Sequence, residues 1–355
     1  MNTQRNNANH KQEEKELQRD RIIDKEAQRV NLVKSGNRFI IAFMTALSND
    51  QKLSSEEKNN YMQRLLHAIF FLGYINDPSV SPMEFIPSLN NLQELIKTKF
   101  PEPCEKYKTH LPRQTPYSIL LEYIGRGMFN NNNELMEQLV AFNKSLWQLG
   151  DENGETLVAN DFAFAAAVIA HSKYDDAKTS IVTYGASMSC KGKDLRKLMI
   201  AISTLHVWHK AISYAVCCGN KQVKIKFRDH FYCNAYNFST KEYAYIPVSP
   251  CSLCYCMYEN VTFHPEFNSN KYASWAYGNC GETESFSKLL LLLESSRNDP
   301  LFTVIDNKGV QLNGTEIENR FNKEYKRSMT DYVNNILKQR NFTFDPKAWQ
   351  LFSPV

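Results

Sequence analysis

The spacing of apolar residues divides the chain into a polar leader, a helical segment and a segment in which helices and strands alternate. Residues 1–34 carry charges of both signs and too few apolar side chains to bury a face, so we expect a flexible leader, with a solvated helix that serves as a contact arm as the alternative. Helical periodicity runs through residues 35–155 and predicts a helical domain. Residues 156–355 alternate between helical and strand patterns, which predicts an α/β domain with a mixed central sheet. The expected fold class is therefore α+α/β.

Capping signals and apolar spacing mark individual helices. Ser54 and Glu57 have the spacing of a capping box at a helix start. Thr315 and Glu318 repeat that spacing ahead of the last helix. Residues 162–169 fit a short helix. The helix after Ser54 is expected to bury Met62, Leu65, Leu66, Ile69 and Leu72, and the last helix to bury Ile317, Phe321, Tyr325, Met329, Tyr332 and Ile336.

Short runs of β-branched and aromatic residues in the second half of the chain are typical of strands. Residues 223–228 alternate between apolar and basic side chains, as a half-exposed strand does. Asn307 and Gly309 separate two apolar runs and so predict a hairpin. The expected strands are Thr179–Tyr184, Val223–Arg228, Tyr243–Val248 and the hairpin Phe302–Leu312.

Charge and hydropathy indicate which partners and which cellular compartment are compatible with the sequence. A net charge of +4 on 355 residues is compatible with many partners and specifies none. The longest uncharged apolar runs, Phe39–Leu47 and Phe162–Ala170, have nine residues each, whereas a membrane-spanning helix needs about 20. No secretory pattern opens the chain, so we expect a cytoplasmic protein with no membrane partner. Nine cysteines in that compartment favour reduced thiols or metal ligands over disulfides.

Lys224, Lys226 and Arg228 form a basic strip on one face of an expected strand. Tyrosine and phenylalanine residues follow closely along the chain. Basic side chains neutralise phosphates and aromatic rings stack on bases, so the strip predicts a nucleoside or single-stranded nucleic acid as a partner. The alternative is a solvated strand edge whose lysines prevent aggregation. The helical domain, residues 35–155, is expected to offer a surface to a protein partner.

Two cysteines and a third, more distant one have the spacing of metal ligands. Cys251 and Cys254 follow an expected strand and Pro250, which favours their placement on the first turn of a helix. The positive end of a helix lowers the pKa of a thiol and so favours zinc binding. Cys280 also precedes an expected helix, and Glu282 lies two residues further on. Three protein ligands with water in the fourth position make a catalytic zinc site, where a nearby carboxylate can move protons.

Other interpretations of these residues remain open. The cysteines could be buried thiols that pack as small hydrophobic groups. Glu282 could be a carboxylate that merely stabilises the positive end of its helix. His206, His209 or His264 could complete the site in place of Cys280, and Cys256 could substitute for a member of the pair. The spacing of His206 and His209 also fits histidines of the core.

The motifs around these cysteines resemble the two zinc motifs of the cytidine and nucleobase deaminase superfamily. S-P-C-x-x-C at residues 249–254 is similar to its second motif, and N-C-G-E at residues 279–282 is similar to its first, H-x-E or C-x-E. The resemblance implies a three-layer, deaminase-like domain over residues 156–355, with zinc held by Cys251, Cys254 and Cys280. It implies that Glu282 is the acid/base in hydrolytic deamination of a nucleoside, nucleobase or nucleic acid. The order of the two motifs is reversed relative to that family.

A second likeness concerns the run YGNCGETESFSKLL at residues 277–290. It is similar to segments of virus- or interferon-induced proteins of vertebrates, mainly fish. That likeness implies an innate-immune setting and no particular reaction. The alternative function is therefore a non-enzymatic innate-immune or interaction protein, in which the same cysteines hold a structural zinc or form a buried cluster.

Overall fold

The computed structural model describes residues 2–87, 91–126, 132–148, 162–219, 223–268, 273–296, 301–343 and 349–354. The expected boundary between residues 155 and 156 lies outside the described residues. No helix within these described ranges is both long enough and apolar enough to cross a bilayer.

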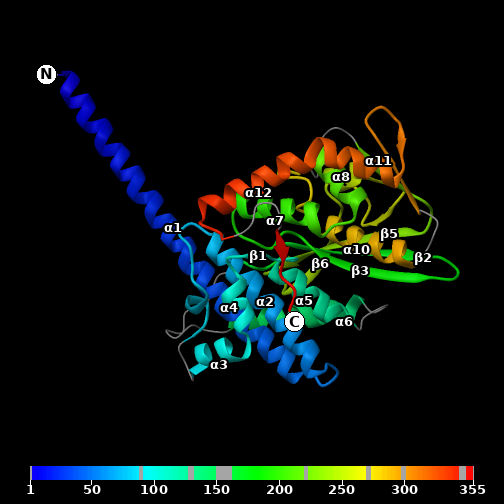
Figure 1. The fold of residues 1–355 in the computed structure, drawn as a ribbon, viewed down its shortest axis with the longest axis horizontal. Coiled ribbons are helices and arrows are strands. Elements are labelled where there is room, and N and C mark those ends of the chain that lie inside the picture. Colours follow the sequence, from blue (N-terminus) through cyan, green and yellow to red (C-terminus); the bar gives the residue numbers. More distant parts are fainter. Residues whose placement is uncertain are drawn as a thin grey trace.

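The chain opens with one long helix, α1 (Asn2–Asn49), whose N-terminal part projects away from the rest of the molecule (Figure 1). The expected leader lies within this helix from residue 2 onward. Its C-terminal part enters the core, where Phe39, Ile40 and Phe43 are fully buried. The other helices of this half are α2 (Ser55–Ile75), η1 (Pro82–Phe85), α3 (Leu92–Lys99), α4 (Pro101–Lys106), α5 (Pro116–Gly125) and α6 (Asn132–Gln148).

The start of α2 confirms the predicted capping box. The Ser54 hydroxyl accepts a hydrogen bond from the Glu57 amide at 3.2 Å, and the Glu57 carboxylate accepts one from the Ser54 amide at 2.8 Å. Every residue of the predicted apolar face of this helix is buried. Helix α2 therefore forms for local reasons, and it packs against α1, α4 and α5 through that face.

A five-stranded mixed sheet forms the centre of the second half. Its strands follow the order β3-β2-β5-β6, and β8 pairs with β5 beyond the end of β6. All of these pairings are antiparallel except that between β8 and β5, so the predicted mixed sheet is confirmed. The strands are β2 (Val168–Asp175), β3 (Ser180–Ala186), β5 (Phe231–Ser239), β6 (Ala244–Val248) and β8 (Thr262–His264).

A second sheet and a short strand pair complete the β structure of the described residues. The second sheet has the order β10-β9-β4-β7, and its β9–β10 pairing confirms the predicted hairpin. Strands β1 and β11 pair in parallel and attach the C-terminal segment to the helical half. These strands are β1 (His110–Leu111), β4 (Lys224–Phe227), β7 (Tyr258–Glu259), β9 (Phe302–Ile305), β10 (Gln311–Leu312) and β11 (Gln350–Leu351).

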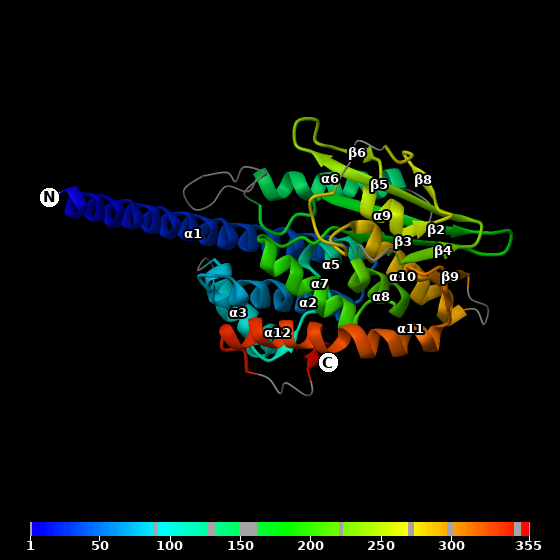
Figure 2. The same ribbon diagram turned by 90° about the horizontal axis from the view of Figure 1, so that it is seen from above.

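Helices cover the two sheets. Figure 2 shows α11 and α12 in one row beside α8 and α7, which they contact. Helix α10 lies against β2 and β3. The helices are α7 (Lys193–His206), α8 (Lys210–Cys218), α9 (Ser252–Met257), α10 (Gly281–Ser296), α11 (Gly314–Phe321) and α12 (Arg327–Gln339).

Helices lie on both faces of the central sheet. Neighbouring residues of a strand point to opposite faces, so successive residues of β3 contact different helices. In β3, Tyr184 points to α5, where a Cβ atom on Gly125 would lie 2.8 Å from the tyrosine ring. Gly185 points to α10, and a Cβ atom on Gly281 would lie 2.8 Å from the Gly185 carbonyl oxygen. This close approach of two glycines places the first turn of α10 directly on the sheet.

Replacing Gly185 by alanine is expected to destabilise the protein by about 1–3 kcal/mol. The added Cβ atom would overlap the carbonyl oxygen of Gly281 and the amide nitrogen of Ser285, which are backbone atoms of α10 and cannot rotate away. Gly314→Ala is the matched control, because no heavy atom lies within 4 Å of the position that its added Cβ atom would occupy. Urea denaturation measures both variants, and equal midpoints for the two would contradict this packing.

Two sequence expectations about secondary structure are wrong. Residues 162–169 form no helix, and β2 begins at Val168. A short apolar run has no periodicity that separates a buried strand from a helix, and β2 is buried between β3 and β5. The last helix is capped by Asn313 with Glu316, not by Thr315 with Glu318.

A π-helical turn, η5 (Asn322–Lys326), separates α11 from α12 and shifts the buried face. Ile317 and Phe321 are buried as expected, but the fully buried residues of α12 are Val333 and Leu337. These lie one position after the expected Tyr332 and Ile336, which are only partly buried. A π turn contains one residue more than an α turn, so the inward face moves by one position.

Buried His67 predicts a loss of stability on acidification. Its ring stacks on Phe352 with centroids 4.0 Å apart, and burial lowers its pKa from the ordinary 6.5 to about 3. Between these values the unfolded chain binds a proton that the folded chain does not, so stability falls as the pH falls through this window. The expected slope is about 1.4 kcal/mol per pH unit. His67→Phe should reduce the slope of denaturation free energy against pH, and an unchanged slope would contradict this assignment.

Candidate metal centre

The first two cysteines of the cluster lie where the chain leaves β6 and enters α9. Cys251 is the N-cap of α9, with extended backbone angles, and Cys254 lies in the first turn. Both side chains are buried. The expectation that both cysteines lie on the first turn is wrong for Cys251, which is the N-cap. Pro250 precedes this N-cap, and Ser252 is the first helical residue.

The third cysteine, Cys280, immediately precedes α10, as expected from the sequence. Gly278 has a positive φ of 85°, which side chains rarely adopt, and it turns the chain into this helix. The Cys280 carbonyl accepts a hydrogen bond from the Thr283 amide at 3.1 Å, which closes the first turn. The contact between Gly185 and Gly281 then fixes Cys280 and the start of α10 against the sheet.

The three thiols lie together, close enough to bind one metal ion. Their sulfur atoms are all within 4.8 Å of one another, and the sulfurs of Cys251 and Cys280 are 3.5 Å apart. A tetrahedral zinc ion with bonds of roughly 2.3 Å holds its sulfur ligands about 3.8 Å apart. The donor set of three soft thiolates also suits zinc. Geometry and ligand chemistry therefore both fit the expected zinc.

Hydrogen bonds within the cluster favour ionisation of one thiol. Side-chain hydrogen bonds from Cys254 and Cys280 lower the pKa of Cys251 to about 3. The hydrogen bonds that Cys254 and Cys280 make to the Cys251 sulfur raise their own pKa values, and burial of both thiols raises them further. Trp275 adds a hydrogen bond from its indole Nε1 to the Cys280 sulfur at 2.9 Å. A bound cation would stabilise all three thiolates at once.

A cavity of about 490 Å³ opens onto the cluster. Cys251 and Cys280 line it, whereas Cys254 is buried and does not. Glu282, which is 3% exposed in the first turn of α10, also lines the cavity. The structure therefore places an accessible face of the thiol cluster and a buried carboxylate in one chamber. Other lining residues include Val168, Ser187, Ile200, Ser249, Trp275 and Asn279.

Sequence reasoning missed the basic rim of this cavity. Lys193, Arg196 and Lys197 line it from the first turns of α7, and all three are exposed. Their spacing places them on one face of a helix, which the sequence could have revealed. Their position beside Cys251 and Cys280 depends on how α7 packs, which no local pattern encodes. Trp275 was also missed, although it is 45% exposed at the cavity wall.

Glu284, the next carboxylate of α10, has a structural role. Its carboxylate accepts hydrogen bonds from the Ser118 hydroxyl at 2.8 Å and from the Ala186 amide at 2.9 Å. Lys288 forms an ion pair with it at 2.8 Å. Glu284 therefore connects the helical half, the edge of the sheet and α10.

The other candidate ligands do not join the cluster. Among the described residues, the one group able to hold a metal consists of Cys251, Cys254 and Cys280. His206, His264 and Cys256 are exposed. His209 is buried, but its Nδ1 accepts a hydrogen bond from the Ala211 amide at 3.2 Å and so caps α8.

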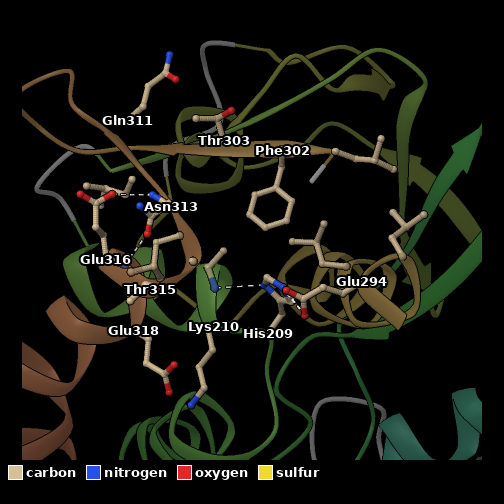
Figure 3. Close-up of a pocket in the computed structure, with 17 residues that line it drawn as sticks. His209, Lys210, Glu294, Phe302, Thr303, Gln311, Asn313, Thr315, Glu316 and Glu318 are labelled. Atoms are coloured by element: carbon tan, nitrogen blue, oxygen red, sulfur yellow. Dashed lines mark hydrogen bonds and ion pairs between the residues drawn. The ribbon is translucent and has the colours of Figure 1, made fainter. Parts of the chain in front are cut away.

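A larger cavity, of about 740 Å³, lies between α8, α10, β9 and α11 (Figure 3). Figure 3 shows His209 and Glu294 together on one side and Asn313 and Glu316 on the other. His209 Nε2 lies 3.2 Å from the Glu294 carboxylate, while burial lowers the pKa of this histidine. Asn313 and Glu316 are occupied in the capping box of α11. These four polar side chains therefore have structural partners, and none of the described residues that line this cavity belongs to the thiol cluster, so the thiol cavity remains the candidate site.

The basic strip has the expected strand geometry. Lys224 and Lys226 are exposed on β4, Ile225 and Phe227 beside them are buried, and Arg228 is exposed just beyond the strand. The strip does not line the thiol cavity. Its binding of a nucleoside or nucleic acid stays a prediction.

The candidate centre unites separate segments of the chain. The end of β6 and the start of α9 provide Cys251 and Cys254, and the start of α10 provides Cys280 and Glu282. The start of α7 provides the basic rim. Comparison with known proteins adds no relative: no protein-family model, no curated protein and no solved structure matches this chain.

Proposed function

We propose that this protein is a zinc-dependent hydrolase of the deaminase type, which acts on a nucleoside, a nucleobase or a nucleic acid. One observation carries the proposal: a single cavity exposes Cys251 and Cys280 of the thiol cluster beside the buried carboxylate of Glu282. A purely structural metal site needs neither an open cavity nor a carboxylate beside it.

The cysteines and the glutamate of the cavity would have different roles in the reaction. Cys251, Cys254 and Cys280 would hold the metal through three thiolates. When bound in this way, zinc lowers the pKa of water and polarises the bond under attack. Glu282 would take a proton from the attacking water and deliver it to the departing amine. A carbon–oxygen bond forms, a carbon–nitrogen bond breaks and ammonia leaves, so the reaction needs no oxidant or reductant.

The fold supports this proposal. The central sheet is mixed and lies between α10 on one face and α5 of the helical half on the other, so it is the middle of three layers, although one outer layer comes from outside residues 156–355. Both zinc-like motifs lie at the start of a helix, α9 and α10, and their thiols meet despite the reversed order in the sequence. The likeness to virus- or interferon-induced proteins adds an innate-immune setting to the proposal.

Ammonia release from amino-bearing bases tests the function. The zinc-loaded protein is incubated with cytidine, adenosine, their 5′-monophosphates and single-stranded oligonucleotides, and ammonia and the product bases are measured. We expect release from at least one of these substrates and none with a Cys280→Ser variant. Absence of ammonia from every substrate, in a protein that holds one zinc per chain, would favour the interaction protein with a structural zinc.

A further inference from the structure

A second cavity adjoins the one at the thiol cluster. It measures about 500 Å³ and shares Ala167, Ser187, Arg196 and Asn279 with its neighbour as lining residues. Each cavity is within the range of about 300–1,000 Å³ that is typical of small-molecule sites. The two cavities therefore lie side by side with Arg196 in both linings, and together, as one depression, they are larger than a single base requires.

Aromatic rings border both parts of this depression. Trp275 lines the first cavity and is 45% exposed, which is unusual for so large an apolar side chain. Trp147 and Phe238 line the second cavity, with ring centroids 4.9 Å apart. Unpaired bases stack on accessible aromatic rings; Trp275 is exposed, whereas Trp147 and Phe238 are partly buried at the wall of the second cavity.

The charge of the depression matches a polyanion. Lys193, Arg196 and Lys197 line the first cavity, and Lys191 lines the second together with Arg196. Among the described residues that line either cavity, Glu282 is the one acidic residue, and it is buried. Cations along an aromatic groove are the combination that binds single-stranded nucleic acid.

We propose that the two adjoining cavities bind a single-stranded nucleic acid, with the reacting base in the thiol cavity and the neighbouring nucleotide beside Trp147 and Phe238. Arg196, which lines both cavities, would contact the phosphate that links the two nucleotides. The inference rests on the proposed function, because the same cavity is the reaction chamber. It assigns substrate binding to α7 and not to the basic strip of β4.

Binding is measured with a Glu282→Gln protein, so that turnover does not interfere, by fluorescence anisotropy of labelled single-stranded DNA and RNA oligonucleotides. Lys193→Ala/Lys197→Ala should weaken binding about tenfold and reduce the slope of log affinity against log salt by about 1.4. The matched control is Lys224→Ala/Lys226→Ala, which removes two exposed lysines from the β4 strip. Equal losses in the two double variants would overturn the assignment to α7.

Ligand length tests the use of both cavities. A dinucleotide should compete with the labelled oligonucleotide more strongly than cytidine 5′-monophosphate does, and Arg196→Ala should remove that advantage. Equal competition by the two ligands in the unmodified cavity would overturn the proposal. Ammonia release by the wild-type protein is read separately. Deamination of a nucleoside without oligonucleotide binding would refute this inference alone. Oligonucleotide binding that is weakened by the Lys193, Lys197 and Arg196 substitutions, without deamination of any substrate, would refute the proposed function alone.

Discussion

Replacing Glu282 by glutamine is expected to lower the rate of deamination by about 10²–10⁴-fold, the usual contribution of a positioned acid or base. Glutamine has nearly the same shape as glutamate but cannot take up and return a proton. Zinc content should stay at one ion per chain, because Glu282 is not a member of the thiol cluster. Ammonia release, metal analysis and urea denaturation of the same preparation measure the three quantities.

Glu284→Gln is the matched control for this variant. Glu284 is buried in the same turn of α10 but does not line the thiol cavity. Its carboxylate accepts hydrogen bonds from Ser118 and Ala186 and forms an ion pair with Lys288. We expect a lower unfolding midpoint and a nearly unchanged rate per folded molecule. Full activity of Glu282→Gln, or equal loss of activity in both variants, would contradict the role assigned to Glu282.

Replacing Cys280 by alanine is expected to abolish stoichiometric zinc binding and the stability that zinc adds. A ligand that binds only the folded chain stabilises it by about 4 kcal/mol when its free concentration is a thousandfold above the Kd. Loss of one of three thiolates should remove most of that gain, since two protein ligands leave the ion largely hydrated. Zinc analysis and urea denaturation with and without a chelator check both expectations.

Cys256→Ala provides the control for the cysteine series. Cys256 is exposed and outside the thiol cluster, although it lies only two residues after Cys254. This variant should bind one zinc ion and should be destabilised by a chelator as much as the wild type. Retention of full zinc by Cys280→Ala, or loss of zinc from Cys256→Ala, would refute the assigned ligand set.

Local sequence signals predict those elements whose causes are local. The capping box of Ser54 and Glu57 and the hairpin of β9 and β10 depend on residues close together in the chain. The start of β2 has the pattern of a short helix, because its apolar run becomes a strand only through pairing with β3 and β5. Strand β5 is not among the predicted strands, although the alternation of buried and partly buried residues along it is that of a strand.

The site is predictable only in part. Residue type and spacing identify Cys251, Cys254 and Cys280 as candidate ligands, because two cysteines three positions apart at a helix start, followed by a third at another helix start, are typical of metal sites. Their convergence depends on the glycine contact between β3 and α10, which brings Cys280 to Cys251. The basic rim of α7 could not be assigned to the site, because a solvated helix face and a binding surface have the same sequence pattern.

The X-ray absorption spectrum of the purified protein at the zinc edge is the most direct test of the metal centre. The geometry of Cys251, Cys254 and Cys280 predicts one zinc per chain, bound by three sulfur atoms at about 2.3 Å and by one oxygen or nitrogen atom. A shell of four sulfur atoms would leave no open position for water. That result, or a protein without zinc, would contradict a hydrolytic centre in this cavity.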